Sequence, residues 1–301
     1  MGRLMEARVR PQTRATYRAV VLPFLGWIAE EALCVASPDS LDDALVEYAE
    51  QGRITRSRFE TLVSAVKFFL PRLPPLACAR ATIDGWARLT PCRHTPPMLR
   101  VFALALAVRL AALGWPACGS LLILQHVLLL RPGEALQLRP ADVTLPEHAP
   151  VYTGPRRLYC SLGAGPWGTK VNRREVVQTM DPLAVQAARR LVLDAQASGQ
   201  ARLVAFDYQA YRHRLAIAAE QLGWTDLRFR PHSPRAGGAT QMLFDGESFA
   251  NIQRAGRWAA EQSCRRYLDA AFALAASMNA HAQAYLALLR MQTLPHGLGA
   301  L

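Results

Sequence analysis

The sequence predicts a mainly α fold with one small antiparallel β-sheet in its C-terminal part, and three observations support this. Apolar residues recur at three- and four-residue spacing over most of the 301-residue chain, which is the period of amphipathic helices. Between about residues 142 and 180 the pattern changes to short β-like runs, DVTL, RLYCSL and REVVQTM, separated by proline and glycine. About half of the residues are apolar, so the chain can bury a core of globular size.

Residues 1–92 are predicted to form a small helical bundle. Helical periodicity runs from Thr13 to about Arg88, in the segments TYRAVVLPFLGWIAEEAL, LDDALVEYAEQ and SRFETLVSAVKFFL. Ser40 and Ser57 stand where helix N-caps are expected. The proline-rich stretch PRLPPLA ends the third helix, and PCRHTPP is typical of a linker, so residues 93–98 are predicted to lead into a second domain, 99–301.

The second domain is predicted to be mostly helical around its small sheet. Two strongly apolar helices are expected at about residues 98–113 and 117–130, before the β-like runs. Further helices are expected at 182–197, 207–222, 236–245, 248–255 and 260–267. The alanine-rich stretch over 268–290 predicts one more helix with an apolar stripe, which either packs on its own domain or docks on a neighbouring copy.

The charge balance favours a polyanionic partner. The chain has 35 basic and 23 acidic residues and a net charge of +12, and most of the excess falls after residue 98. Such a field suits nucleic acid or an anionic membrane surface, although a basic protein with a merely solvated surface has the same balance. The longest apolar run, LLILQHVLLL, is too short to span a bilayer, so no membrane partner is expected.

The cysteines and the N-terminus indicate an intracellular protein. The 6 cysteines are scattered, without a CxxC pair or a zinc-binding spacing, which is typical of reduced buried thiols. The N-terminal stretch lacks the apolar core of a secretion signal. A nucleus and a bacterial cytoplasm fit these features equally well.

The segment HSPRAGGAT carries the sharpest chemical signal. Pro234 suits the first turn of a helix, where its missing N–H costs nothing, so His232 and Arg235 are predicted to lie together at a helix N-terminus. Such an end attracts anions; an arginine can fork onto a phosphate, and a histidine can exchange a proton near neutral pH. An isolated HxxR is more often ordinary surface chemistry.

A second arginine and a lysine precede this segment. Arg131 lies in LLRPGEALQL between apolar stretches, where a charge needs a partner: either a salt bridge to Glu134 or Asp142, or the same phosphate. Lys170 lies in TKVNRREV, at a predicted hairpin, and is the only lysine after Lys67. The neighbouring GAGPWG fits a tight turn better than a dinucleotide-binding loop, because no long helix follows it.

Trp258 and Tyr267 are the last two candidate site residues along the chain. Trp258 lies in the segment GRW, and Tyr267 follows at the end of the next predicted helix. A phenol is a poor nucleophile unless cations stabilise the phenolate, and Arg265 and Arg266 precede this tyrosine. A lone tyrosine in such a helix is usually core packing, but here it follows two arginines, a histidine and a lysine in a workable order.

These segments resemble the tyrosine recombinases, the phage-integrase family of DNA breaking and joining enzymes. The resemblance covers about residues 98–290 and is strongest in LLRPGEALQLRPADV and HSPRAGGATQMLFDGESFANIQRAGRWAAEQSCRRYLD. It is closest to the Cre-like branch, which has tryptophan in place of the second histidine. Pro234 departs from the family's pattern, which has an apolar residue there, and the stretch from Arg131 to Lys170 is unusually long. The resemblance implies the DNA breaking-rejoining fold, with residues 1–92 as a core-binding domain.

The resemblance also implies a phosphate clamp. By motif, Arg131 and Arg235 hold the scissile phosphate, Glu134 supports the first arginine, and Trp258 donates its indole N–H. Two arginines and an indole donor can stabilise the charge that develops in phosphoryl transfer, so neither a metal nor another cofactor is expected.

The remaining roles concern the nucleophile and the protons. By motif, Tyr267 forms a 3′-phosphotyrosyl link, Lys170 protonates the leaving 5′-oxygen, and His232 takes part in proton transfer and phosphate binding. Because the tyrosine ester conserves the energy of the broken bond, no ATP is required.

The resemblance predicts a site-specific recombinase that acts on double-stranded DNA as a homo-oligomer, with four protomers in the synapse. Integration, excision and resolution all fit this chemistry. Two alternatives use the same residues differently: a type IB topoisomerase-like enzyme would relax DNA as a monomer, and an inactive relative would only bind DNA.

Overall fold

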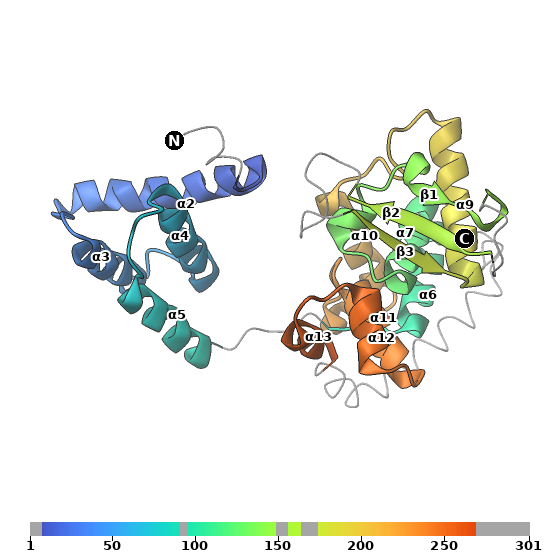
Figure 1. Cartoon of the computed structure of the whole chain (residues 1–301). Helices are drawn as coiled ribbons and strands as arrows, with labels where there is room; N and C mark the ends of the chain where they lie inside the picture. Colours follow the sequence, from blue (N-terminus) through green and yellow to red (C-terminus); the bar gives the residue numbers. More distant parts are fainter. Residues whose placement is uncertain (1–7, 91–95, 149–155, 164–173, 269–301) are drawn as a thin grey trace. The chain divides into compact units, whose positions relative to one another are not determined.

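The computed structural model describes residues 8–90, 96–148, 156–163 and 174–268, except for the side chains of residues 266 and 267 (Figure 1). The chain divides into two compact units, Met1–Arg93 and His94–Leu301, and each is described here by itself. The described residues are mainly helical, with a three-stranded antiparallel sheet in the second unit. The fold class predicted from the sequence is therefore confirmed.

The first unit is a bundle of helices around an aromatic core. Its elements are α2 (Pro11–Glu30), α3 (Pro38–Glu50), α4 (Arg56–Phe69) and α5 (Ala77–Leu89). The rings of Trp27 and Tyr48 lie 5.1 Å apart between centroids, and Phe24 meets Tyr48 edge-on at 5.3 Å. All three side chains are buried, so the apolar stripes of α2 and α3 meet at this point.

Two N-caps predicted for the first unit, Ser40 and Ser57, are wrong. Ser37, not Ser40, is the N-cap of α3, and Ser40 completes a capping box with it. α4 begins after Thr55, so Ser57 lies inside the helix. The N-terminus of α5 has no cap of its own; instead, Asp42 of α3 accepts hydrogen bonds from two of its backbone N–H groups, at 2.7 and 2.8 Å.

The second unit is built around one buried helix, α7 (Pro116–Val127). Its residues from Cys118 to His126 are all buried. It packs against α6 (Arg100–Ala112), α9 (Pro182–Ala197) and α11 (Ser233–Phe244), and α10 (Tyr208–Gln221) packs on α6. The apolar run that seemed too short for a membrane is therefore the core of this unit, and none of the helices in the described part of the chain could cross a membrane.

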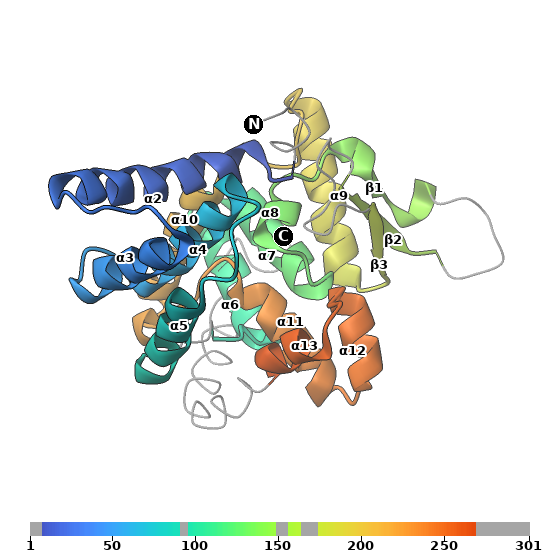
Figure 2. The same cartoon turned by 60° about the vertical axis from the view of Figure 1, so that its left-hand side comes forward.

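The sheet has the strand order β1 (Val143–Thr144), β2 (Leu158–Leu162) and β3 (Glu175–Thr179), antiparallel throughout. On the central strand, β2, Cys160 lies opposite Val143 of β1 and Val177 of β3. Every second residue of β2, from Leu158 to Leu162, is buried. Figure 2 shows α9 running beside the sheet. The second unit also contains the short helical segments α8 (Pro132–Ala135), η1 (Pro140–Asp142), η2 (Pro146–His148) and η3 (Thr225–Leu227).

Three helices close the unit: α11, α12 (Phe249–Gly256) and α13 (Glu261–Leu268). α11 approaches its neighbours unusually closely because it carries Gly237 and Gly238. A Cβ atom on Gly237 would lie 1.7 Å from the Met98 carbonyl oxygen, and one on Gly238 would lie 2.1 Å from that of His126. The glycine pair thus allows the start of α11 to press against α7 and the segment before α6. The helix predicted over 268–290 lies outside the described residues, apart from Leu268.

Candidate functional site

His232 and Arg235 lie at the start of α11, as the sequence indicated. His232 is the N-cap residue, Pro234 lies in the first turn, and Arg235 follows it. The turn is held from outside by Met98, whose N–H donates to the Ser233 carbonyl at 3.0 Å. Pro234 therefore fits without displacing the helix, because the first-turn N–H groups have no intrahelical acceptor.

A buried amide anchors the chain just before His232. Gln125 of α7 donates from Nε2 to the Pro231 carbonyl at 2.5 Å, and its Oε1 accepts from the Tyr211 hydroxyl at 2.8 Å. Both side chains are fully buried. No role was predicted for Gln125 from the sequence, although a polar residue inside the run LLILQHVLLL is a signal for a specific hydrogen bond.

Arg235 is buried in a cage of backbone and ring atoms. It is only 1% exposed, and it donates from Nη1 to the Leu129 carbonyl and from Nη2 to the Gly256 carbonyl. Its guanidinium carbon lies 4.6 Å from the centroid of the Trp258 ring. Trp258 therefore holds Arg235 by a cation–π contact, a relationship that was not predicted from the sequence.

Arg131 pairs with Glu134 at the start of α8, one of the partners that the sequence left open. Nη1 of Arg131 lies 2.6 Å from Oε1 of Glu134, and the backbone N–H of Arg131 donates to Oε2 at 2.8 Å. The other partner considered for Arg131, Asp142, binds Arg139 instead, at 2.8 Å. Arg131 is half-buried, with a side chain 22% exposed.

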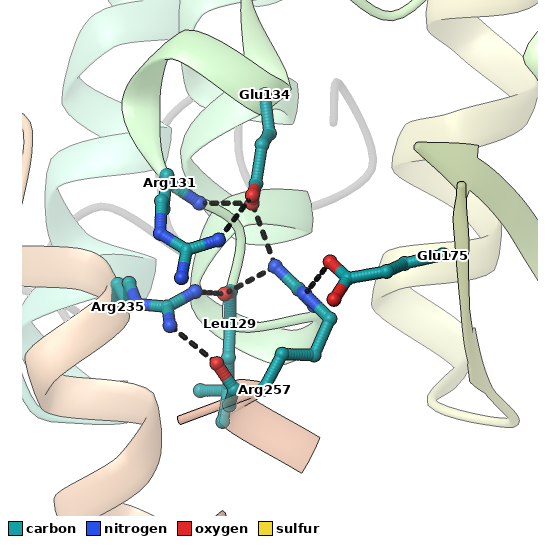
Figure 3. A network of polar contacts seen from close by, with 7 residues as sticks. Leu129, Arg131, Glu134, Glu175, Arg235 and Arg257 are labelled. Atoms are coloured by element: carbon teal, nitrogen blue, oxygen red, sulfur yellow. Dashed lines mark hydrogen bonds and ion pairs between the residues drawn. The ribbon is translucent and has the colours of Figure 1, made fainter. Parts of the chain in front are cut away.

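A third arginine, Arg257, links the Arg131–Glu134 pair to the Leu129 carbonyl that Arg235 binds (Figure 3). Its Nη2 donates to Oε2 of Glu134 at 2.6 Å and to the Leu129 carbonyl at 3.3 Å. Its Nε lies 3.2 Å from Oε2 of Glu175, on β3. Arg257 is the middle residue of GRW, yet no role was predicted for it from the sequence; the signal was a charged residue between Gly256 and a tryptophan.

Neighbouring charges shift the pKa values of Glu134 and Arg257. Burial raises the pKa of Glu134, but Arg257 and Arg131 outweigh it, so the pKa lies below its usual value. Burial lowers the pKa of Arg257, and Glu134 and Glu175 compensate in part. A guanidinium stays protonated in proteins. Arg131 and Arg257 therefore place two positive charges beside the carboxyl groups of Glu134 and Glu175.

Helix α13, which carries Tyr267, packs beside this site. Cys264 and Leu268, on either side of Tyr267 in the sequence, are buried in one apolar cluster with Leu129 and Trp258. The backbone of Tyr267 is therefore adjacent to the elements that hold Arg235, whereas its side chain is outside the described part. Lys170 also lies outside the described residues.

The structure thus brings Arg131, Glu134, Arg235 and Trp258 together, with His232 at the adjacent helix start. Within the described ranges, no three His, Cys, Asp or Glu side chains are grouped so as to hold a metal ion. The concentrated groups are cations and N–H donors, which suit a phosphate.

Comparison with solved structures shows the class of fold: it is that of site-specific DNA recombinases and integrases. The XerH site-specific recombinase in a post-cleavage complex with a palindromic difH substrate matches with a TM-score of 0.56 and 12% identity, over 88% of this chain and 79% of that one. A lambda integrase dimer bound to a COC′ core site matches with a TM-score of 0.55 and 12% identity, over 87% and 73%.

A pre-cleavage complex of XerH with difH gives a TM-score of 0.55 at 13% identity, over 84% of this chain and 74% of that one. Searches against protein-family models and among curated proteins find no match. The likeness is therefore one of fold.

Proposed function

We propose that this protein is a tyrosine-type site-specific DNA recombinase. The observation that carries the proposal is the convergence of Arg131 and Arg235 beside the helix of Tyr267, within a recombinase fold. The two arginines come from different parts of the chain. Arg235 of α11 donates to the Leu129 carbonyl, and Arg131, just before α8, donates to the Glu134 carboxylate. Trp258, in place of the histidine of other branches, makes the site Cre-like.

The chemistry follows from the groups present. The phenolic oxygen of Tyr267 attacks the scissile phosphorus, its proton passing to a base for which His232 is the candidate. The bond from phosphorus to the 5′-oxygen breaks, and Lys170 supplies the proton to that oxygen. Arg131, Arg235 and the Trp258 indole stabilise the charge on the non-bridging oxygens. Rejoining is the reverse reaction with another 5′-hydroxyl.

Burial of Arg235 adds a requirement to this scheme. Because the side chain is 1% exposed, a DNA phosphate reaches it only if neighbouring groups move on binding. The net charge of +12 supports attraction of the duplex, which is long-range and depends on salt.

We also propose the domain organisation and the assembly. Residues 1–92 form the core-binding domain, 93–98 the linker and 99–301 the catalytic domain. The helix over 268–290 would connect four protomers on two duplexes inside the cell. The apolar stripe in its sequence suits docking on a neighbouring copy as well as packing on its own domain.

A covalent-capture experiment tests the function. Duplexes that bind the non-cleaving Tyr267→Phe protein are first selected from a random library, and nicked versions are then incubated with the native chain. We expect a protein–DNA adduct that survives denaturant and is absent with Tyr267→Phe. An adduct that persists in the variant would remove Tyr267 as the nucleophile.

Binding without any adduct would favour the inactive DNA-binding relative. If adducts form, a supercoiled plasmid with two selected sites separates the remaining alternatives. Recombinant circles are expected from a recombinase, whereas relaxation without strand exchange would favour the topoisomerase-like enzyme.

A further inference from the structure

Arg257 has a backbone conformation that glycine adopts more readily than arginine. It is the C-cap residue of α12, with φ 57° and ψ 40°, in the left-handed region. A residue with a Cβ atom is disfavoured there, and such strain persists where the side chain is held by its surroundings. Arg257 is held in this way, because its side chain is 9% exposed and lies between two carboxylates.

The acceptors of Arg257 are shared with the two arginines of the proposed phosphate clamp (Figure 3). The Glu134 carboxylate accepts from Arg131 and from Arg257, each at 2.6 Å. The Leu129 carbonyl accepts from Arg235 and, at 3.3 Å, from Arg257. One guanidinium thus bonds to the supporting group of each clamp residue.

The third partner extends the link to the sheet. Glu175 is the first residue of β3, the strand that follows Lys170 in the chain, and it pairs with Nε of Arg257 at 3.2 Å. Removing Arg257 would leave Glu175 without an ion-pair partner in the described part of the chain. Glu134 would then be held by Arg131 alone.

We propose that Arg257 is a positioning residue that fixes the spacing of the Arg131 and Arg235 guanidinium groups and ties them to β3. This inference rests on the proposed function, because spacing matters only if both arginines hold one phosphate. Arg257 itself acts through Glu134 and the Leu129 carbonyl. The prediction is a defect in the cleavage step and not in DNA affinity.

Two substitutions test this in the 301-residue chain on the selected nicked duplex. Arg257→Gly relaxes the backbone at φ 57° while it removes the guanidinium. Glu175→Gln keeps the volume and removes one ion pair. With saturating protein, we expect adduct formation to slow about 100-fold in Arg257→Gly, as for misplaced catalytic groups, and about 10-fold in Glu175→Gln. The dissociation constant for DNA should change less than about threefold, since a phosphate ion-pair contact is not lost.

Chemical rescue distinguishes positioning from folding. Low millimolar guanidinium ion should restore part of the Arg257→Gly cleavage rate, because it can occupy the space between Glu134 and Glu175. It should leave the Glu175→Gln rate unchanged. Arg254→Ala, which removes the exposed arginine of the same helix, is the matched control for the loss of one positive charge.

The outcomes separate the two proposals. No adduct with the native chain would refute the proposed function itself. If the native chain forms adduct and both Arg257→Gly and Glu175→Gln cleave at its rate per bound protein, the positioning role is wrong. A loss that appears only in DNA affinity or in the folded fraction, without guanidinium rescue, would also overturn it.

Discussion

The Arg235 guanidinium lies over the Trp258 ring, with 4.6 Å between its central carbon and the ring centroid. Gly256 leaves the space that this ring occupies, since a Cβ atom on Gly256 would lie 1.7 Å from the indole. In the proposed site Trp258 would have two separable functions. Its face contacts and orients Arg235, and its indole N–H would donate to the phosphate.

Replacing Trp258 by phenylalanine or by alanine should separate these functions. Trp258→Phe keeps an aromatic face for Arg235 and loses the N–H, so adduct formation should slow about 10-fold, which corresponds to roughly 1.4 kcal/mol. Trp258→Ala also opens a cavity and should lower the unfolding free energy by about 3–5 kcal/mol and slow cleavage much further. Equal rates for the two variants would show that stacking on Arg235 contributes nothing.

The close approach of α11 gives a prediction about stability. Gly237→Ala would drive its Cβ atom into the Met98 backbone, so it should lower the unfolding free energy by about 1–3 kcal/mol or more. Gly133→Ala in α8 is the matched control: a Cβ atom on Gly133 would have no neighbour within 4 Å, so this change should be neutral or stabilise by up to about 1 kcal/mol. Thermal unfolding measures both. Equal midpoints would mean that α11 does not require the glycine.

The buried amide of Gln125 gives a second prediction about stability. Gln125→Met keeps the length of the side chain but leaves the Pro231 carbonyl and the Tyr211 hydroxyl without this partner. Each buried group left unpaired costs about 1–3 kcal/mol, so this variant should lose more than Tyr211→Phe, which breaks one bond. Denaturant unfolding of both and of the double variant measures the coupling. Purely additive losses would contradict the network.

The sequence predicted those parts of the fold and of the candidate site that depend on residues close together in the chain. The bounds of α9, Pro182–Ala197, follow from apolar periodicity and were predicted at 182–197. The pairing of Arg131 with Glu134 was one of three predicted options, beside Asp142 and a phosphate, because Arg131 and Glu134 lie three residues apart at a helix start. Both features are set by the spacing of residues within a short stretch of the chain.

The contacts of Arg257 could not be predicted in the same way. It reaches Glu134 and Leu129, more than a hundred residues earlier, and only after α12 has ended in a left-handed turn. The cation–π contact between Arg235 and Trp258 likewise depends on how α11 and α12 pack. Sequence motifs singled out Arg235 and Trp258 separately, whereas the tertiary packing decides that they touch.

His126 gives a prediction about pH. It is buried on α7, its Nε2 has no hydrogen-bond partner in the described part of the chain, and its pKa is lowered from 6.5 to about 4, chiefly by burial. Arg100 contributes to this lowering, while Asp181, a hydrogen bond with the Met98 backbone and Asp245 act in the opposite direction. The imidazole is therefore neutral in the folded protein at neutral pH.

The sign of the effect follows from the lowered pKa. Between about pH 6.5 and 4 the unfolded chain binds the proton and the folded protein does not, so stability falls as the pH falls through this range. The loss attributable to His126 is on the order of 3 kcal/mol and is complete below the folded pKa. His126→Gln, which has a similar volume and can still donate to the Met98 backbone, removes the titration. Denaturant unfolding of both proteins at several pH values should therefore show the native chain losing stability more steeply between pH 6.5 and 4. Parallel curves would mean that His126 is protonated in the folded protein at the same pH as in the unfolded chain.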